Sequence, residues 1–298
     1  MNVSMNLGYY SPNKFYLSNM AYSKYRQSFD HNLMLFNKSE DFKDKIGKIS
    51  LGNWEQIACG LIFLRCQEFM ISILKLCNEG NLEDSRVLTR SLFEHYIHLK
   101  YIKKKKQGRK FIAFYWVGIK AFLDDYEHKF PDGLIGSDEF NGFKNTVLRN
   151  YDDVKADYTF KGRKWLKWLY IFLRRHNIRR NWSSVRLSIM AKKVKDKKIH
   201  DFVMRNYSAN VHCDIFGMSR FVKEFGEKII FDNSPKADNM DDILGLSAQF
   251  FGGVVANLAI IYDTDIPQEF LQYLPDTDIK FKAKNSPQDP LVPSAPRI

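Results

Sequence analysis

The residues best suited to chemistry lie in the stretch 198–224, where Arg205 and Asn206 stand together and His212 follows after five further residues. An arginine holds phosphate oxygens with a planar fork of donors. A histidine exchanges a proton near neutral pH. A fixed cation and a titratable imidazole in one neighbourhood are therefore suited to phosphodiester chemistry. The plainer interpretation is a surface arginine and a histidine satisfied within the core.

The spacing of Arg205 and His212 decides how close the two side chains lie. On an uninterrupted helix seven residues advance the chain by about 700°, so both side chains point the same way, about 10 Å apart along the axis. Ser208 offers an alternative, because serine is a good helix cap and a new helical segment starting there would change the separation.

The run R-N-Y-S-A-N-V-H, residues 205–212, resembles the motif of the HEPN superfamily of all-helical proteins. That motif is Arg, four to six residues, then His, often with Asn, Asp or His directly after the Arg. The resemblance implies an endoribonuclease that needs no metal and no cofactor. In such an enzyme His212 acts as general acid/base on a 2′-hydroxyl or on the leaving oxygen. Arg205 holds the scissile phosphate, and Asn206 positions either group by hydrogen bonding.

The same resemblance implies partners and a biological role. It implies RNA as substrate, a homodimer in which two motifs meet at the interface, and a toxin or anti-phage defence effector with an antitoxin or other regulatory protein as partner. It covers the motif helix well and the helices in 54–105 only in outline. Because other HEPN proteins only bind, the alternative is a non-catalytic helical protein that binds nucleic acid, a nucleotide or a partner protein.

A second group of polar residues lies on the helix predicted over 82–105. Arg90 and Glu94 share one face of it with Arg86, because the three are spaced by four residues. In HEPN proteins a polar residue of an earlier helix commonly faces the motif helix, so we expect Arg90 and Glu94 to support the motif. Arg90 and Glu94 form either a buried ion pair or this supporting shell, and the alternative is an ordinary i,i+4 salt bridge. Arg90 and His95 form a second Arg-x4-His match, but about 140° separates them on a helix, which disfavours a joint site.

Glu94, His95 and His98 are of the residue types that bind zinc. No third or fourth ligand stands at a convincing spacing from the two histidines. We therefore predict no metal site.

The positive charge of the chain is concentrated in one block. The formal net charge is +12, and residues 161–205 contain 15 Lys and Arg against two Asp. Aromatic residues interleave with the cations, a pattern that binds single-stranded nucleic acid by charge and stacking. The candidate nucleic-acid-binding residues are Lys164, Lys167, Arg174 and Arg175. The alternative is a solvated helical face over buried tryptophans.

Apolar periodicity predicts an all-α fold. The resemblance implies a HEPN-like helical bundle, to which the sequence adds an N-terminal arm and a basic helical insertion. The predicted parts are an arm with one or two short helices over 1–52, a helical domain over 53–265 that includes the basic insertion 161–197, and a partly disordered tail over 266–298. Helices are expected over 54–78, 82–105, 109–129, 137–157, 185–195 and 243–262, with a motif helix within 198–224. Asn53 and Asn81 are the expected N-caps, the latter in a capping box with Asp84. We expect the aromatic residues of 109–129 in the core.

The segment 243–262 carries no charge and reaches the length of a membrane span. Gln249, Asn257 and the pair Gly252-Gly253 weaken that interpretation, and small residues favour close packing onto another helix. We predict a core or dimer helix and no membrane attachment, and a membrane span is the alternative. The four cysteines form no C-x-x-C pair and no secretory signal opens the chain, so we expect reduced thiols and a cytoplasmic protein.

Overall fold

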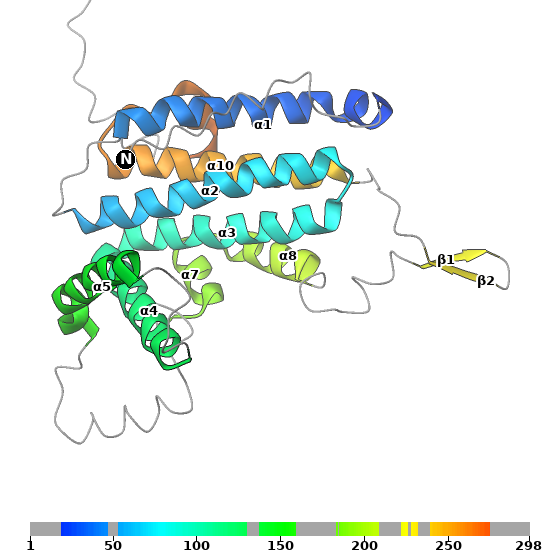
Figure 1. Cartoon of the computed structure of the whole chain (residues 1–298). Coiled ribbons are helices and arrows are strands. Elements are labelled where there is room, and N and C mark those ends of the chain that lie inside the picture. The colour runs from blue at the N-terminus through cyan, green and yellow to red at the C-terminus, as the bar shows by residue number, and fades with distance from the viewer. Residues whose placement is uncertain are drawn as a thin grey trace, which may run out of the picture.

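The structure is a computed structural model that describes residues 19–46, 53–129, 137–158, 183, 185–208, 222–225, 228–231 and 239–274. Within these ranges the chain is almost entirely helical, which confirms the predicted all-α class (Figure 1). The described elements are α1 (Asn19–Ile46), α2 (Trp54–Asn78), α3 (Leu82–Lys105), α4 (Gly108–Lys129), α5 (Ser137–Tyr158), α7 (Leu187–Lys193), α8 (Lys197–Tyr207), β1 (Val222–Phe225), β2 (Lys228–Phe231), α10 (Met240–Ile261) and the 3-10 helix η3 (Gln268–Tyr273).

Helices α2, α3 and α10 form the core of the bundle. Helix α1 covers it on one side, and α7 and α8 lie against α3 on the other (Figure 1). Helices α2 and α10 are apolar on most sides, as expected of helices with neighbours all round. The Asn53 side chain accepts a hydrogen bond from the backbone amide of Gln56 at 3.2 Å. This confirms Asn53 as the N-cap of α2.

The uncharged segment forms the buried helix α10. Its two adjacent glycines allow close approach of two tyrosine rings: an added Cβ would lie 2.2 Å from Tyr273 Cδ2 at Gly252, and 2.6 Å from Tyr96 Cε2 at Gly253. The prediction of a core helix is therefore confirmed, and the small residues serve close packing. By length and composition α2 and α10 could each cross a membrane, but 61% and 78% of their most apolar windows are buried inside the bundle.

The N-terminal part of the chain differs from the arm of short helices that we predicted. Helix α1 is 28 residues long, and its buried side chains, such as Phe29, Leu35 and Phe42, belong to the same core as those of α2 and α10. Asn32 Nδ2 donates to the carbonyl of Leu244 on α10 at 3.2 Å. Residues 19–46 are thus a structural helix of the bundle.

The start of α3 also differs from the prediction. Asn81 precedes the helix, but its side chain makes no capping hydrogen bond to the backbone. Instead Asn81 Nδ2 donates to the Asp84 carboxylate at 2.7 Å. The predicted capping box is therefore wrong, because the two polar side chains satisfy each other.

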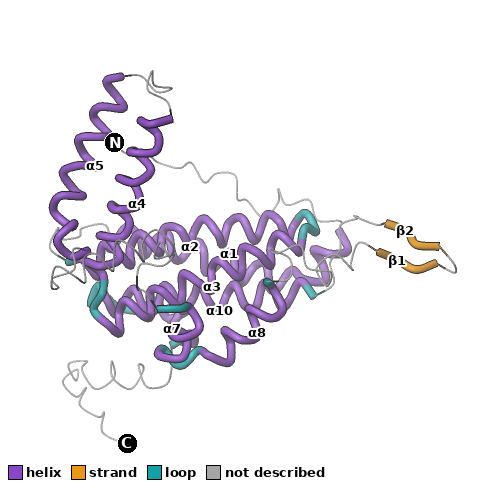
Figure 2. The backbone as a smooth tube through the Cα atoms, turned by 90° about the horizontal axis from the view of Figure 1, so that it is seen from below, coloured by secondary structure: helices purple, strands orange, loops and turns teal. Residues whose placement is uncertain are grey.

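Helices α4 and α5 pack on each other and project away from the bundle (Figure 2). Phe111, Phe114 and Trp116 pack against the core. Tyr115 and Phe122 are 49% and 64% exposed. The prediction that all the aromatics of α4 lie in the core is wrong for these two. Phe122 lies in the far half of α4, which extends beyond the core helices, and Tyr115 packs its ring edge-on against Trp116 instead.

Two segments after α8 differ from the predicted structure. Residues 222–225 are a strand that pairs antiparallel with 228–231, so a helix reaching residue 224 is wrong. In the predicted tail, Phe270 of η3 is fully buried, and the Tyr273 hydroxyl lies 2.7 Å from His31 Nε2 of α1. Residues 266–274 therefore belong to the bundle, and residues 275–298 of the predicted tail lie outside the described residues.

Candidate functional site

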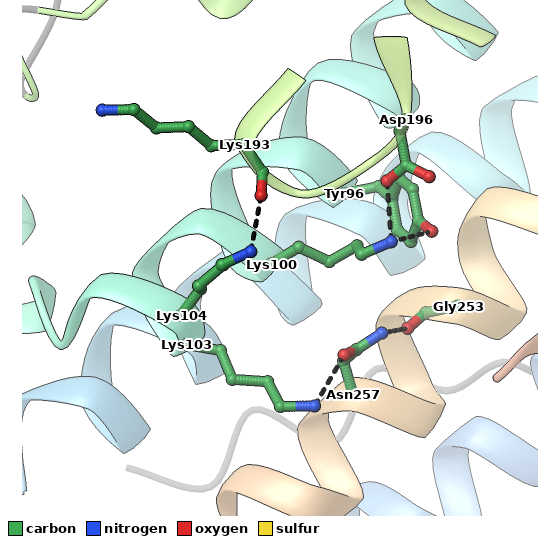
Figure 3. A network of polar contacts seen from close by, with 8 residues as sticks. All are labelled: Tyr96, Lys100, Lys103, Lys104, Lys193, Asp196, Gly253 and Asn257. Atoms are coloured by element: carbon green, nitrogen blue, oxygen red, sulfur yellow. Dashed lines mark hydrogen bonds and ion pairs between the residues drawn. The ribbon is translucent and has the colours of Figure 1, made fainter. Parts of the chain in front are cut away.

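Helix α8, which carries Arg205 and Asn206, lies antiparallel along α3. Its N-terminal turn is fixed by Lys100 of α3, whose ammonium donates to Asp196 at 2.7 Å and to the Tyr96 hydroxyl at 3.0 Å (Figure 3). Further along, the ring of His200 lies 6.3 Å from that of Phe93. These contacts fix the direction in which the other face of α8 points.

The Lys100 contact is an ion pair removed from solvent. The side chains of Lys100 and Asp196 are each only 12% exposed. Burial alone would lower the pKa of Lys100, but Tyr96 and Asp196 oppose it and the net shift is upward. Lys100 therefore stays charged, and its ammonium group stabilises the contact between α3 and the start of α8.

The two faces of α8 differ sharply in composition. His200, Val203 and Tyr207 are buried, and the spacing of three and four residues puts them on one side of the helix. Arg205 is two residues from both Val203 and Tyr207, so about 160° separates it from the buried side. Arg205 and Asn206 are exposed accordingly.

The helix carrying the motif ends before the histidine. Helix α8 stops at Tyr207, and Ser208 is its C-cap. The geometry predicted for an uninterrupted helix from Arg205 to His212 is therefore wrong, because the helix between them ends. Asn206 Nδ2 donates to the Phe202 carbonyl at 2.8 Å, so the side chain of Asn206 hydrogen-bonds to the backbone of the last turns of α8. His212 itself lies outside the described residues.

Arg90 and Glu94 form the expected pair on α3. Arg90 Nε lies 3.1 Å from Glu94 Oε1, and the side chains are 19% and 34% exposed. Arg90 Nη1 is buried and makes no hydrogen bond within the described part of the chain. Glu94 thus pairs along its own helix, and Arg205 points away from α3. The structure does not bring Glu94 and Arg205 together, and a supporting role for the pair remains a prediction.

Tyr207 adds a buried hydroxyl at the C-terminal end of α8. Its ring is 4% exposed, and among the described residues its hydroxyl oxygen has no hydrogen-bond partner. Burial raises the pKa of Tyr207 to about 12, while the nearby charge of Arg86 acts in the opposite direction. The hydroxyl is therefore neutral at physiological pH.

His95 packs against α2, and His98 lies beside it on α3, with the two ring centroids 6.3 Å apart. His95 Nδ1 lies 2.8 Å from the Ser91 carbonyl, and its ring packs edge-on against Phe69. Burial, and secondarily His95, lower the pKa of His98 to about 4. Within the described ranges no three His, Cys, Asp or Glu side chains are grouped closely enough to hold a metal ion.

A basic surface forms where α3 and α7 end, and it joins part of the predicted basic block 161–205 to the lysine run at the end of α3. Lys104 Nζ donates to the Lys193 carbonyl at 2.7 Å, so two lysine runs far apart in sequence lie side by side (Figure 3). Exposed cations here are Lys104, Lys105, Lys106, Lys192, Lys193, Lys195, Lys197 and Lys198. We call this group the lysine surface. The sequence showed both runs, but only the tertiary contact joins them.

The cations that we predicted to bind nucleic acid, Lys164, Lys167, Arg174 and Arg175, lie outside the described residues. Cys59, Cys66 and Cys77 are buried free thiols. Burial raises the pKa of Cys77 to about 12 and that of the other two further still. These three thiols are therefore protonated and unreactive.

Comparison with known proteins gives one assignment. No curated protein and no solved structure matches the chain. The model of DUF5677, described as a family of unknown function, matches residues 56–229. That range runs from α2 through α8 to β2 and covers more than half of the chain. The protein belongs to the DUF5677 family.

Proposed function

We propose that this protein is a metal-independent endoribonuclease of HEPN type. The observation that carries the proposal is the orientation of α8. One face is fixed against α3 by buried contacts, and the opposite face presents Arg205 and Asn206 to solvent at the end nearest His212 in sequence. An arginine placed in this way is available to a phosphate, whereas a structural arginine would be committed to a partner.

The proposed chemistry uses the ribose of the substrate as nucleophile. His212 takes the proton of the 2′-hydroxyl, and the 2′-oxygen attacks the adjacent phosphorus. The bond from phosphorus to the 5′-oxygen breaks, and that oxygen receives a proton. The products are a 2′,3′-cyclic phosphate and a 5′-hydroxyl. Arg205 stabilises the charge that develops on the phosphate, and Asn206 orients the phosphate or the imidazole.

The lysine surface supports RNA as the substrate class. Five of its cations, Lys192, Lys193, Lys195, Lys197 and Lys198, lie in the segment that leads into α8, and only Asp196 and Asp201 interrupt the positive charge between Lys192 and Arg205. Asp196 is paired with Lys100 inside the fold, and Asp201 is paired with Lys197 and His200. A surface of this charge attracts the phosphate backbone independently of sequence.

The wider role extends the same proposal. A cytoplasmic toxin or anti-phage effector would act as a homodimer, with an antitoxin or another regulatory protein controlling it. Burial of most of the apolar surface of α10 inside the bundle is in keeping with action away from the membrane.

The test exploits the requirement for a 2′-hydroxyl. A DNA oligonucleotide with one ribonucleotide should be cut only after that nucleotide and should yield a cyclic phosphate. The all-DNA oligonucleotide should remain intact. Equal cleavage of the two oligonucleotides would contradict the proposed mechanism, because the all-DNA oligonucleotide has no attacking 2′-hydroxyl.

A non-catalytic binding protein is the second candidate, and the lysine surface favours it directly. In that case the protein would bind the oligonucleotide that contains the ribonucleotide but would not cut it. Substitution of His212 by Ala would then leave binding unchanged.

A further inference from the structure

An aromatic side chain stands between two cations on the exposed face of α8. Lys198, Phe202 and Arg205 are all exposed, and Phe202 is 50% exposed. Their spacing of four and three residues puts them within about 60° of one another around the helix. Lys198 and Arg205 are about 10 Å apart along the axis, with Phe202 between them.

Exposure of Phe202 has no explanation in the packing of α8. The helix buries His200, Val203 and Tyr207 against α3, and Phe202 is about 100° or more from each of them around the axis. The backbone carbonyl of Phe202 accepts a hydrogen bond from Asn206 Nδ2. This bond does not involve the phenyl ring, which stays exposed. Other rings of the described chain are exposed too, such as Phe122 at 64%, but Phe202 differs in lying between two cations, a combination suited to a ligand with both rings and negative charge.

Charge selects the kind of ligand. The lysine surface includes Lys198 at the start of α8 and Lys104 at the end of α3, and the contact of Lys104 with the Lys193 carbonyl holds the ends of α3 and α7 together (Figure 3). The one acidic residue on the exposed side of α8 is Asp201, whose pKa is lowered by hydrogen bonds from Lys197 and His200. Its charge is therefore offset by its own neighbours.

We infer that the Lys198–Phe202–Arg205 stripe is a binding track for single-stranded RNA, in which a base stacks on Phe202 while Lys198 and Arg205 hold phosphates on either side. Aromatic stacking requires an unpaired base, whereas phosphate contacts alone do not distinguish single strands from duplexes. The inference deepens the proposed function, on which it rests for RNA as the ligand class, and it adds selection of single strands. The lysine surface extends the track along the strand.

The test is fluorescence anisotropy with a 2′-O-methyl oligouridine, which has no attacking hydroxyl and stays intact whether or not the protein is a nuclease. Phe202→Ala should weaken binding about tenfold or more, and Phe202→Trp should retain it. Lys198→Ala should reduce the slope of log affinity against log salt by about 0.7. The parent should bind the single strand more tightly than a duplex of equal length.

Matched controls come from the α4–α5 hairpin. Phe122 is 64% exposed, and Lys129 is exposed on the same helix. Phe122→Ala and Lys129→Ala should bind as the parent does. Because Phe202 is half-exposed, its substitution should leave the melting temperature within a few degrees of the parent value.

The outcomes separate the two proposals. Weaker binding by Phe202→Ala together with uncut natural RNA supports the track and overturns the nuclease. Unchanged binding by Phe202→Ala, with RNA cut at the parent rate, overturns the track and leaves the nuclease standing. A loss of binding to phosphatidylserine vesicles in Phe202→Ala, with RNA binding unchanged, overturns the track in favour of a membrane surface.

Discussion

Lys100 on α3 and Asp196, directly before α8, form an ion pair of 2.7 Å with only 12% of each side chain exposed. The pair fixes the start of α8 on the core helix and so determines which face of α8 meets solvent. The exposed position of Arg205 is a consequence of this contact and of the buried residues that follow it.

Loss of one partner of this pair should be costly. Lys100→Met leaves Asp196 partly buried without its cation, and we expect a loss of about 2 to 4 kcal/mol in the free energy of unfolding. Lys100→Met combined with Asp196→Leu should recover much of that loss, since no buried charge remains. Urea denaturation measures both. Lys129→Met is the control: it breaks an exposed pair with Asp125 and should cost less than about 1 kcal/mol. Equal losses in Lys100→Met and Lys129→Met would contradict the account.

Two glycines of α10 should respond to alanine in opposite directions. At Gly253 an added Cβ would lie 2.6 Å from Tyr96 Cε2, whereas at Gly245 nothing lies within 4 Å. Gly253→Ala should destabilise the protein by about 1 to 3 kcal/mol through overpacking. Gly245→Ala should stabilise it by about 0.5 to 1 kcal/mol, because alanine favours the helix. Thermal unfolding of both variants measures these changes. A Gly253→Ala variant as stable as the parent would show that α10 is not packed closely on Tyr96.

Acid should destabilise the fold through His98. Burial and His95 lower the pKa of His98 from 6.5 to about 4, so the unfolded chain binds the proton more readily than the folded one. The resulting stability is fully present above pH 6.5 and is lost as the pH falls towards 4. By linkage this amounts to about 2 kcal/mol between pH 7 and pH 5.

The measurement for His98 is the dependence of the unfolding free energy on pH. His98→Gln should show a flatter dependence than the parent between pH 7 and pH 5, whatever its stability at pH 7. His95 has its pKa lowered in the same direction, so a shallower dependence should remain. Parallel curves for parent and His98→Gln would refute the assignment.

A lysine in a left-handed backbone conformation should be improved by glycine. Lys195 ends α7 with a φ of 69°, a region in which a side chain is unfavourable and glycine is not. Lys195→Gly should therefore raise the free energy of unfolding by about 1 kcal/mol. Lys75→Gly, within the regular helix α2, should lower it by about 1 kcal/mol. A destabilised Lys195→Gly would show that its side chain stabilises the fold.

Local patterns predicted the helices of the core with little error. The bounds of α2 and α3 agree with the prediction, because strong apolar periodicity and terminal Asn or Gly residues mark them. Helix α1 was missed as a core element because polar residues such as Asn32 and Ser39 interrupt its apolar pattern. Both are buried, and both donate hydrogen bonds to backbone carbonyls, which composition alone does not show.

The candidate site was predictable only in part. The sequence shows the residue types of Arg205 and Asn206 and places them on a helix. It also contains the i, i+4, i+7 spacing of Lys198, Phe202 and Arg205. The lysine surface was not predictable, because it exists only where Lys104 meets the Lys193 carbonyl. Contacts between segments this far apart leave no local periodicity in the sequence.

The proposed function requires that Arg205 and His212 cut RNA without a metal ion. The most direct measurement incubates total cellular RNA with the protein in EDTA and compares the parent with Arg205→Ala and His212→Ala. Arg186→Ala is the matched control, since Arg186 is an exposed arginine at the start of α7. We predict cleavage by the parent and by Arg186→Ala, and intact RNA with the other two variants. Cleavage by His212→Ala at the parent rate, or no cleavage by the parent, would contradict the account.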